Sequence, residues 1–118
     1  MKKGEKYPKS IIERFEAFEK VCNIEEMSIS VFQGSGYRGD DEICVIGEVI
    51  GDRLPYDVLI LITVHNEMGE VIGTNFRESL EAKSFSGIHS FSRDVSVACD
   101  QEISKVRVYP VKNPTCWE

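Results

Sequence analysis

Hydrophobic and polar residues alternate along most of this chain, which is the pattern of β-strands that bury one face. The clearest example lies between Ile43 and Gly73, where three strand-like segments follow one another across two tight connections. Over the whole chain the alternating segments are 27–33, 43–50, 57–65, 70–77, 84–98 and 103–111. Gly87 interrupts the fifth segment and is expected to divide it into two strands. The pattern therefore predicts about seven short strands in a two-sheet sandwich.

One segment before the strands has helical spacing instead. Its apolar residues recur at intervals of three or four positions: Ile11, Phe15, Phe18 and Cys22. Ser10 and Glu13 stand three positions apart at its start, as in a capping box. The spacing predicts an amphipathic helix over about residues 10–22. A helix of about three turns is marginal alone in water, so we expect it to pack on the sandwich.

Two of the predicted strands are apolar on both faces. Ile46 in segment 43–50, and Leu59 and Leu61 in segment 57–65, fall on the parity that a half-exposed strand would leave polar. This doubling predicts that the second face of the sheet is also covered. The N-terminal helix is one candidate for the cover, and a second copy of the chain in a homo-oligomer is another.

Length and composition are those of one soluble globular domain. The chain has 118 residues, of which 42% are hydrophobic and 29% charged. We expect one domain over 1–118, with the sandwich at about 27–112 and a short C-terminal tail. The net charge of −6 disfavours binding to nucleic acid or to anionic membranes.

No apolar run approaches the roughly 20 residues that a membrane span needs, so membrane insertion is not expected. The basic start Met1-Lys2-Lys3 is not followed by the apolar region of a signal peptide. The expected compartment is therefore the cytoplasm, with an extracytoplasmic place only if a leader has been removed.

The four cysteines are widely separated, at positions 22, 44, 99 and 116. None forms a Cys-x-x-Cys pair, so a structural zinc site is not expected. Cys44 and Cys99 lie in an early and a late strand, roughly where immunoglobulin domains place their inter-sheet disulfide. Without a secretion signal, free thiols are the favoured interpretation, and the disulfide remains the alternative.

Catalytic residues are not grouped in this sequence. The two histidines, His65 and His89, stand far from each other and outside any motif that joins a nucleophile, a base and a carboxylate. No phosphate loop, dinucleotide fingerprint or hydrolase motif occurs. We therefore expect a protein that is not an enzyme and name no catalytic residue.

Acidic residues give the sequence its one candidate cation site. Oxygen ligands from two loops at the same end of a sandwich suit Ca²⁺, which takes six to eight of them. The candidate ligands are Asp40, Asp41, Glu42, Asp52 and Asp57. The spacing of an EF-hand loop is absent, so calcium is the alternative hypothesis, and otherwise no cofactor is expected.

Three aromatic residues fall in predicted loops or in the tail, where exposed rings often anchor partners. They are Tyr37, Tyr56 and Trp117. The sequence makes them candidate partner-binding residues, with packing over the ends of the sheets as the competing interpretation.

Two short motifs resemble the FxLYD-type immunoglobulin-like domains of bacteria. Gly47-Glu48-Val49 and Val71-Ile72-Gly73-Thr74 match the outer parts of that pattern, whereas Ile62 to Asn66 stands in place of its central F-x-L-Y-D. The resemblance covers roughly residues 43 to 111. It implies a seven-stranded immunoglobulin-like antiparallel sandwich of adhesive or accessory type, with no implied ligand. The resulting hypothesis is a non-catalytic protein-interaction or accessory module, and the alternative is a calcium or small-ligand module that uses the acidic loops.

Overall fold

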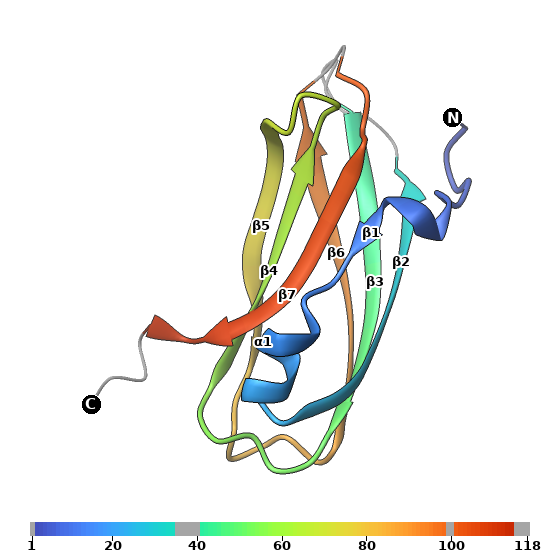
Figure 1. Cartoon of the computed structure of the whole chain (residues 1–118). Coiled ribbons are helices and arrows are strands. Elements are labelled where there is room, and N and C mark those ends of the chain that lie inside the picture. The colour runs from blue at the N-terminus through green and yellow to red at the C-terminus, as the bar shows by residue number, and fades with distance from the viewer. Residues whose placement is uncertain (1, 35–40, 99–100, 115–118) are drawn as a thin grey trace.

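The computed structural model describes residues 2–34, 41–98 and 101–114, which form seven strands and one α-helix (Figure 1). The strands are β1 (Ile12–Glu13), β2 (Ile24–Gln33), β3 (Asp41–Gly51), β4 (Val58–His65), β5 (Val71–Leu80), β6 (Ile88–Val97) and β7 (Lys105–Lys112). The helix is α1 (Glu16–Val21), and a turn of 3-10 helix, η1 (Lys9–Ile11), precedes β1.

The strands form two sheets that face each other across one core (Figure 1). Sheet A holds β2, β3 and β6 in that order, and sheet B holds β1, β7, β4 and β5. Neighbouring strands are antiparallel except β1 and β7, which are parallel. The prediction of a mainly β chain of about seven strands in two sheets is confirmed.

Each of the six alternating segments contains one strand, but the expected division at Gly87 is wrong. Residues 84–87 lie outside any strand, and Gly87 has a φ of 103° directly before β6 begins. A positive φ suits glycine because it has no Cβ, and here it turns the chain into the strand. The seventh strand is instead β1, inside the segment that was expected to be helical.

Alternation determines which residues form the core. On β3 the odd-numbered residues 43, 45 and 49 are buried, and on β4 the even-numbered residues 58 to 64 are buried. The largest completely buried side chains come from both sheets: Met27, Val31, Ile43, Val45, Ile60, Ile62, Val95 and Val106. Apolar burial of this extent is the main stabilising contribution to the fold.

The predicted helix over residues 10–22 is reduced to the six residues of α1. Ser10 lies in η1 and caps nothing, and Phe15 precedes α1 without a side-chain cap. Ile12 and Glu13 are extended because they pair with β7, where Glu13 also meets a cation. The β-branched Ile12 suits a strand, so tertiary pairing outweighs the helical spacing. No helix in the described residues is long and apolar enough to cross a membrane.

The N-terminal segment changes from one sheet to the other. Residues 4–7 lie along the end of β2, where the N–H of Tyr7 donates to the carbonyl of Val31 (2.8 Å) and the N–H of Gly4 to that of Gln33 (2.7 Å). After Pro8 and η1 the chain reaches sheet B, where β1 pairs with β7. The segment thus closes one long side of the sandwich, and α1 contacts both β2 and β7 on the same side.

The other long side is closed by β5 and β6, the edge strands that face each other. The N–H of Ala98 donates to the carbonyl of Ile72 (3.1 Å), and Nδ2 of Asn75 donates to the carbonyl of Asp94 (3.0 Å). A Cβ on Gly73 would stand 2.7 Å from the carbonyl oxygen of Ser96. Glycine at this position therefore permits the close approach of the two strands.

The expected cover over the outer faces is only partly present. Ile46 stays 45% exposed on the outer face of sheet A, which α1 does not cover. Leu59 and Leu61 are half-buried on the outer face of sheet B. Because α1 lies at the side of the sandwich, it reaches only the β7 part of that face.

Candidate interaction site

The alternative hypothesis of a calcium site placed its acidic ligands at one end of the sandwich, whereas the structure places the described candidates at both ends of β3. Asp41 is the first residue of β3, and Asp52 directly follows its last residue. Because an extended strand rises about 3.3 Å per residue, the two carboxylates lie roughly 35 Å apart. Asp57 lies near Asp52, where its Oδ1 accepts a hydrogen bond from the N–H of Ala82 (2.8 Å). Glu42 is at the Asp41 end, and Asp40 lies outside the described residues. The part of the chain that the structure describes contains no cluster of three or more potential metal ligands.

Of the three aromatic candidates, only Tyr56 lies within the described residues; Tyr37 and Trp117 do not. The Tyr56 ring is half-buried, and its hydroxyl lies 3.9 Å from Sγ of Cys22. Nζ of Lys112 stands over the ring, 5.3 Å from its centre. Burial of the hydroxyl raises the pKa of Tyr56, and the contact with the thiol acts in the same direction. Tyr56 therefore packs at the end of sheet B where β4 begins, and it presents only part of its ring to solvent.

Both histidines have structural partners. His65 is buried, with Nε2 2.9 Å from Oγ1 of Thr63 and Nδ1 3.2 Å from the carbonyl oxygen of Gly69. It therefore fixes the hairpin between β4 and β5. His89 instead points into the side of the sandwich, where it meets Glu78.

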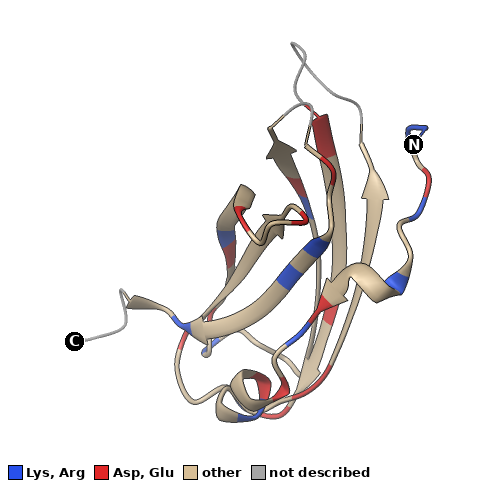
Figure 2. Cartoon of the chain, turned by 45° about the horizontal axis from the view of Figure 1, so that its top comes forward, with Lys and Arg blue, Asp and Glu red and all other residues tan. Residues whose placement is uncertain are grey.

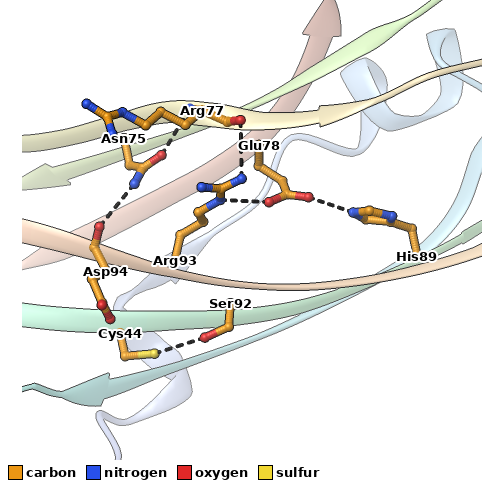
Figure 3. A network of polar contacts seen from close by, with 8 residues as sticks. All are labelled: Cys44, Asn75, Arg77, Glu78, His89, Ser92, Arg93 and Asp94. Atoms are coloured by element: carbon orange, nitrogen blue, oxygen red, sulfur yellow. Dashed lines mark hydrogen bonds and ion pairs between the residues drawn. The ribbon is translucent and has the colours of Figure 1, made fainter.

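Glu78 is the centre of a polar network that joins the two sheets (Figure 3). Its carboxylate is nearly buried, with Oε2 2.6 Å from Nε2 of His89 and Oε1 2.8 Å from Nε of Arg93. Glu78 comes from β5 and both partners come from β6, so the network spans the gap between the edge strands. Glu78 was not predicted from the sequence. The available signal was that His89 and Arg93 share their strand face in segment 84–98 with apolar residues, which indicates a buried acidic partner for them.

An apolar strip crosses the outer face of sheet B from α1 to β5. We define this strip as Phe15, Phe18, Tyr109, Leu61 and Phe76. The rings of Phe15 and Phe18 pack on Tyr109, with centroids 5.2 and 5.8 Å away. Tyr109 on β7 is the register partner of Leu61 on β4, and directly opposed side chains on one face are in contact range.

A bulge in β5 places the last member of the strip. The register pairs Ile60 with Glu78 and Ile62 with Asn75, which leaves Phe76 and its neighbour opposite Leu61. An extra residue of this kind bends a strand and redirects its side chains. Phe76 is 47% exposed, and at the other end of the strip Phe18 is 45% exposed.

A shallow apolar groove continues the strip at the end of β7. Its volume is about 310 Å³, and Phe18, Val21, Tyr56 and Val111 line it together with Lys112. Val21 is 66% exposed. Contiguous exposed apolar surface of this kind is uncommon on monomers and typically marks a contact with another molecule. The strip and the groove therefore form the candidate interaction site.

Ionic groups border the strip where β1 meets β7. The guanidinium of Arg107 donates to Oε1 of Glu13 at 2.6 Å and also lies 5.9 Å from the centre of the Phe15 ring. Lys105 reaches Oε2 of the same carboxylate at 3.4 Å. The hydrogen bond from Arg107 is the main cause of a lowered Glu13 pKa, which the attraction of Lys105 reinforces and partial burial opposes.

This ion pair predicts a pH-dependent contribution to stability. Because the folded-state pKa of Glu13 lies below its usual value of 4.5, the contribution is fully present above that pH. It is lost as the pH falls through the folded-state pKa. We expect Glu13→Gln to lower the free energy of unfolding by at most about 1 kcal/mol at neutral pH, as for other solvent-accessible ion pairs. Urea unfolding of both proteins across this range measures the difference, and a difference that grows with acidity would contradict the prediction.

Two cysteines within the described residues are free thiols. Cys22 is 1% exposed, and burial raises the pKa of its thiol. Cys44 is half-buried on the outer face of sheet A, with Sγ 3.4 Å from Oγ of Ser92 (Figure 3). It therefore points away from the space between the sheets. Cys99, its suggested disulfide partner, lies outside the described residues.

The contrast between the thiols predicts selective labelling. Because the thiolate is the reactive form, we expect iodoacetamide to modify Cys44 at least tenfold faster than Cys22 in the native protein. Peptide mass spectrometry at successive times gives both rates, and the same measurement in urea is the control, where the rates should converge. Equal rates in the native protein would contradict the burial of Cys22.

Part of this site was visible in the sequence. The doubled apolar pattern of segment 57–65 identified Leu61 as a residue on a covered or contacted face. Phe76 gave no such signal, because a bulge cannot be located from one strand alone.

Comparison of the chain with family models, with curated proteins and with solved structures finds no match in any of the three.

Proposed function

We propose that this chain is a non-catalytic interaction module of immunoglobulin-like type that binds a protein partner through the outer face of sheet B. The observation that carries the proposal is the apolar strip, which stays exposed at both ends although α1 lies beside it. Buried aromatic side chains are the usual anchors of protein interfaces. The FxLYD-like motifs agree with an accessory role.

Strand order supports the immunoglobulin-like assignment. Sheet A, with β2, β3 and β6, corresponds to strands A, B and E of such a sandwich. In sheet B, β4 and β7 correspond to strands C and F, and β5 to the additional strand beside C. The position of the last strand, G, is taken by β1, which runs parallel to β7. Strand position G is therefore occupied by only the two residues of β1.

Site-specific photo-crosslinking tests the proposal. With benzoylphenylalanine in place of Phe76, we expect a discrete adduct with one protein when the full chain is irradiated in lysate of its source organism. Phe18→Ser at the far end of the strip should reduce the adduct strongly, because a lost anchor costs about 2 kcal/mol or more, roughly thirtyfold in affinity.

Two controls make the crosslinking specific. The photoreactive residue in place of Ile88, which is 55% exposed on sheet A, should give no adduct with that protein. Phe18→Ser should leave the free energy of unfolding within about 1 kcal/mol of the parent value, since half of the ring is in solvent. An adduct that forms equally from sheet A, or that is insensitive to Phe18→Ser, would overturn the proposal.

A further inference from the structure

The two outer faces of the sandwich carry opposite charge. On the outward positions of sheet A the strands hold four carboxylates and no cation: Glu26, Glu42, Glu48 and Asp94. On those of sheet B they hold Arg77, Lys105 and Arg107, against the single carboxylate of Glu13 on β1. Figure 2 shows the basic segments along β7 and the acidic residue of β1 beside them. The basic face thus belongs to a chain whose net charge is −6.

The cations of sheet B surround the apolar strip. Arg107 precedes Tyr109 by two residues on the same face of β7, and Lys112 lines the groove beyond it. Arg77 shares the bulge with Phe76 at the β5 edge. On α1, Glu16 and Lys20 are both exposed and offset each other. The strip therefore has positive charge on three sides.

From this arrangement we propose that the partner of sheet B is an acidic protein segment. Its apolar side chains cover the strip, and its carboxylates meet Arg107 and Lys105 on one side and Lys112 and Arg77 on the others. This inference rests on the proposed function and adds the chemistry of the partner. Complementary charge raises the rate of encounter and excludes wrong partners, while the apolar contacts supply affinity.

Glu13 occupies part of the site in the free protein. Its carboxylate holds Arg107 and Lys105 at 2.6 and 3.4 Å, as a carboxylate of the partner would. A partner must therefore compete with Glu13 for these cations. This gives the proposal a distinctive consequence: removal of the Glu13 charge strengthens binding of an acidic segment, although it slightly weakens the fold.

Charge also disfavours a symmetric pair of sheet B faces. In such a pair the cations of one copy would face those of the other, and like charges across an interface are costly. Packing of sheet A of one copy on sheet B of another is electrostatically allowed but joins two different surfaces, which leads to rings or open chains of molecules. A separate acidic partner would cover the outer face of sheet B without repulsion between like charges and without joining copies of the chain into larger assemblies.

The test starts from an unbiased selection. A phage-displayed library of random peptides is selected on the full chain, and selected peptides are mapped by amide chemical shifts of the labelled protein. We expect sequences with acidic residues on both sides of apolar ones, with shifts centred on Leu61, Phe76 and Tyr109. Arg77→Glu and Lys112→Glu should each weaken binding at least fivefold, Lys83→Glu, a cation elsewhere on the surface, should not, and Glu13→Gln should strengthen it.

The outcomes separate the two proposals. Neutral or basic peptides that map to the strip would overturn the acidic partner and leave the interaction function in place. Peptides that map only to other surfaces would overturn both. Two further results would count against the acidic segment: a mass that rises with protein concentration, which indicates a second copy, and binding of a fluorescent single-stranded oligonucleotide to the strip.

Discussion

Gly47→Ala is expected to lower the free energy of unfolding by about 3 kcal/mol. Gly47 lies in the middle of β3, directly opposite Phe91 on β6, and the Phe91 ring occupies the space where a side chain would be. An added Cβ would overlap this ring and stand 2.9 Å from Cδ1 of Ile29. Overpacking of a core costs about 1–3 kcal/mol, and this overlap is severe enough to reach the upper end. Urea unfolding of the variant gives the difference.

A double-mutant cycle tests the cause. Phe91→Leu alone should destabilise the protein, because it removes a buried ring. In that background Gly47→Ala should cost at least about 1 kcal/mol less than in the parent chain, since the overlap is gone. Glu48→Ala, the next residue on the solvent side of β3, serves as the matched control and should stay within about 0.5 kcal/mol. Strict additivity of the two core changes would contradict the proposed overlap.

Glu78→Ala should lower the free energy of unfolding by about 2–4 kcal/mol. The change leaves His89 and Arg93 without their acidic partner, and loss of one member of a buried ion pair costs about 3–5 kcal/mol. Both partners are about one-third exposed, so water compensates part of the loss. The value is measured by urea unfolding at constant pH.

Two related variants show whether charge or shape matters at Glu78. Glu78→Gln keeps the size and can still accept hydrogen bonds, so it should cost less than Glu78→Ala. Glu81→Ala, an exposed acidic residue just beyond the end of β5, should have almost no effect. If Glu78→Ala behaves like Glu81→Ala, the network does not join the sheets energetically.

The strands were predictable because alternation is a local property of the sequence. Ile43, Val45 and Val49 share a parity, and the structure buries all three. The N-terminal segment was not predictable in the same way. Ile12 and Glu13 lie in a segment with helical spacing of its apolar residues, and their pairing with residues more than 90 positions away makes them extended.

The candidate site was only partly predictable, for the same reason. Tyr109 and Leu61 become neighbours through sheet register, and Phe76 joins them through a bulge. Neither feature has a signature in one sequence, because register depends on long-range pairing. The acidic residues show the opposite case, in which proximity in the sequence does not become proximity in the fold. Asp41 and Asp52 are close in sequence, but an extended strand holds them apart.

The two long sides of the sandwich differ in how much must break before they open. On the β5–β6 side a backbone hydrogen bond and the Glu78 network hold the edges together. On the other side residues 4–7 hydrogen-bond to β2, but the link from there to sheet B consists of the two residue pairs between β1 and β7 and the packing of the six-residue α1. Local opening follows the less stable side. We therefore expect the two sheets to separate transiently at the side of β1 and α1, while the contacts between β5 and β6 persist. Slow native labelling of Cys22 would then report the frequency of this partial opening, at a lower free-energy cost than complete unfolding.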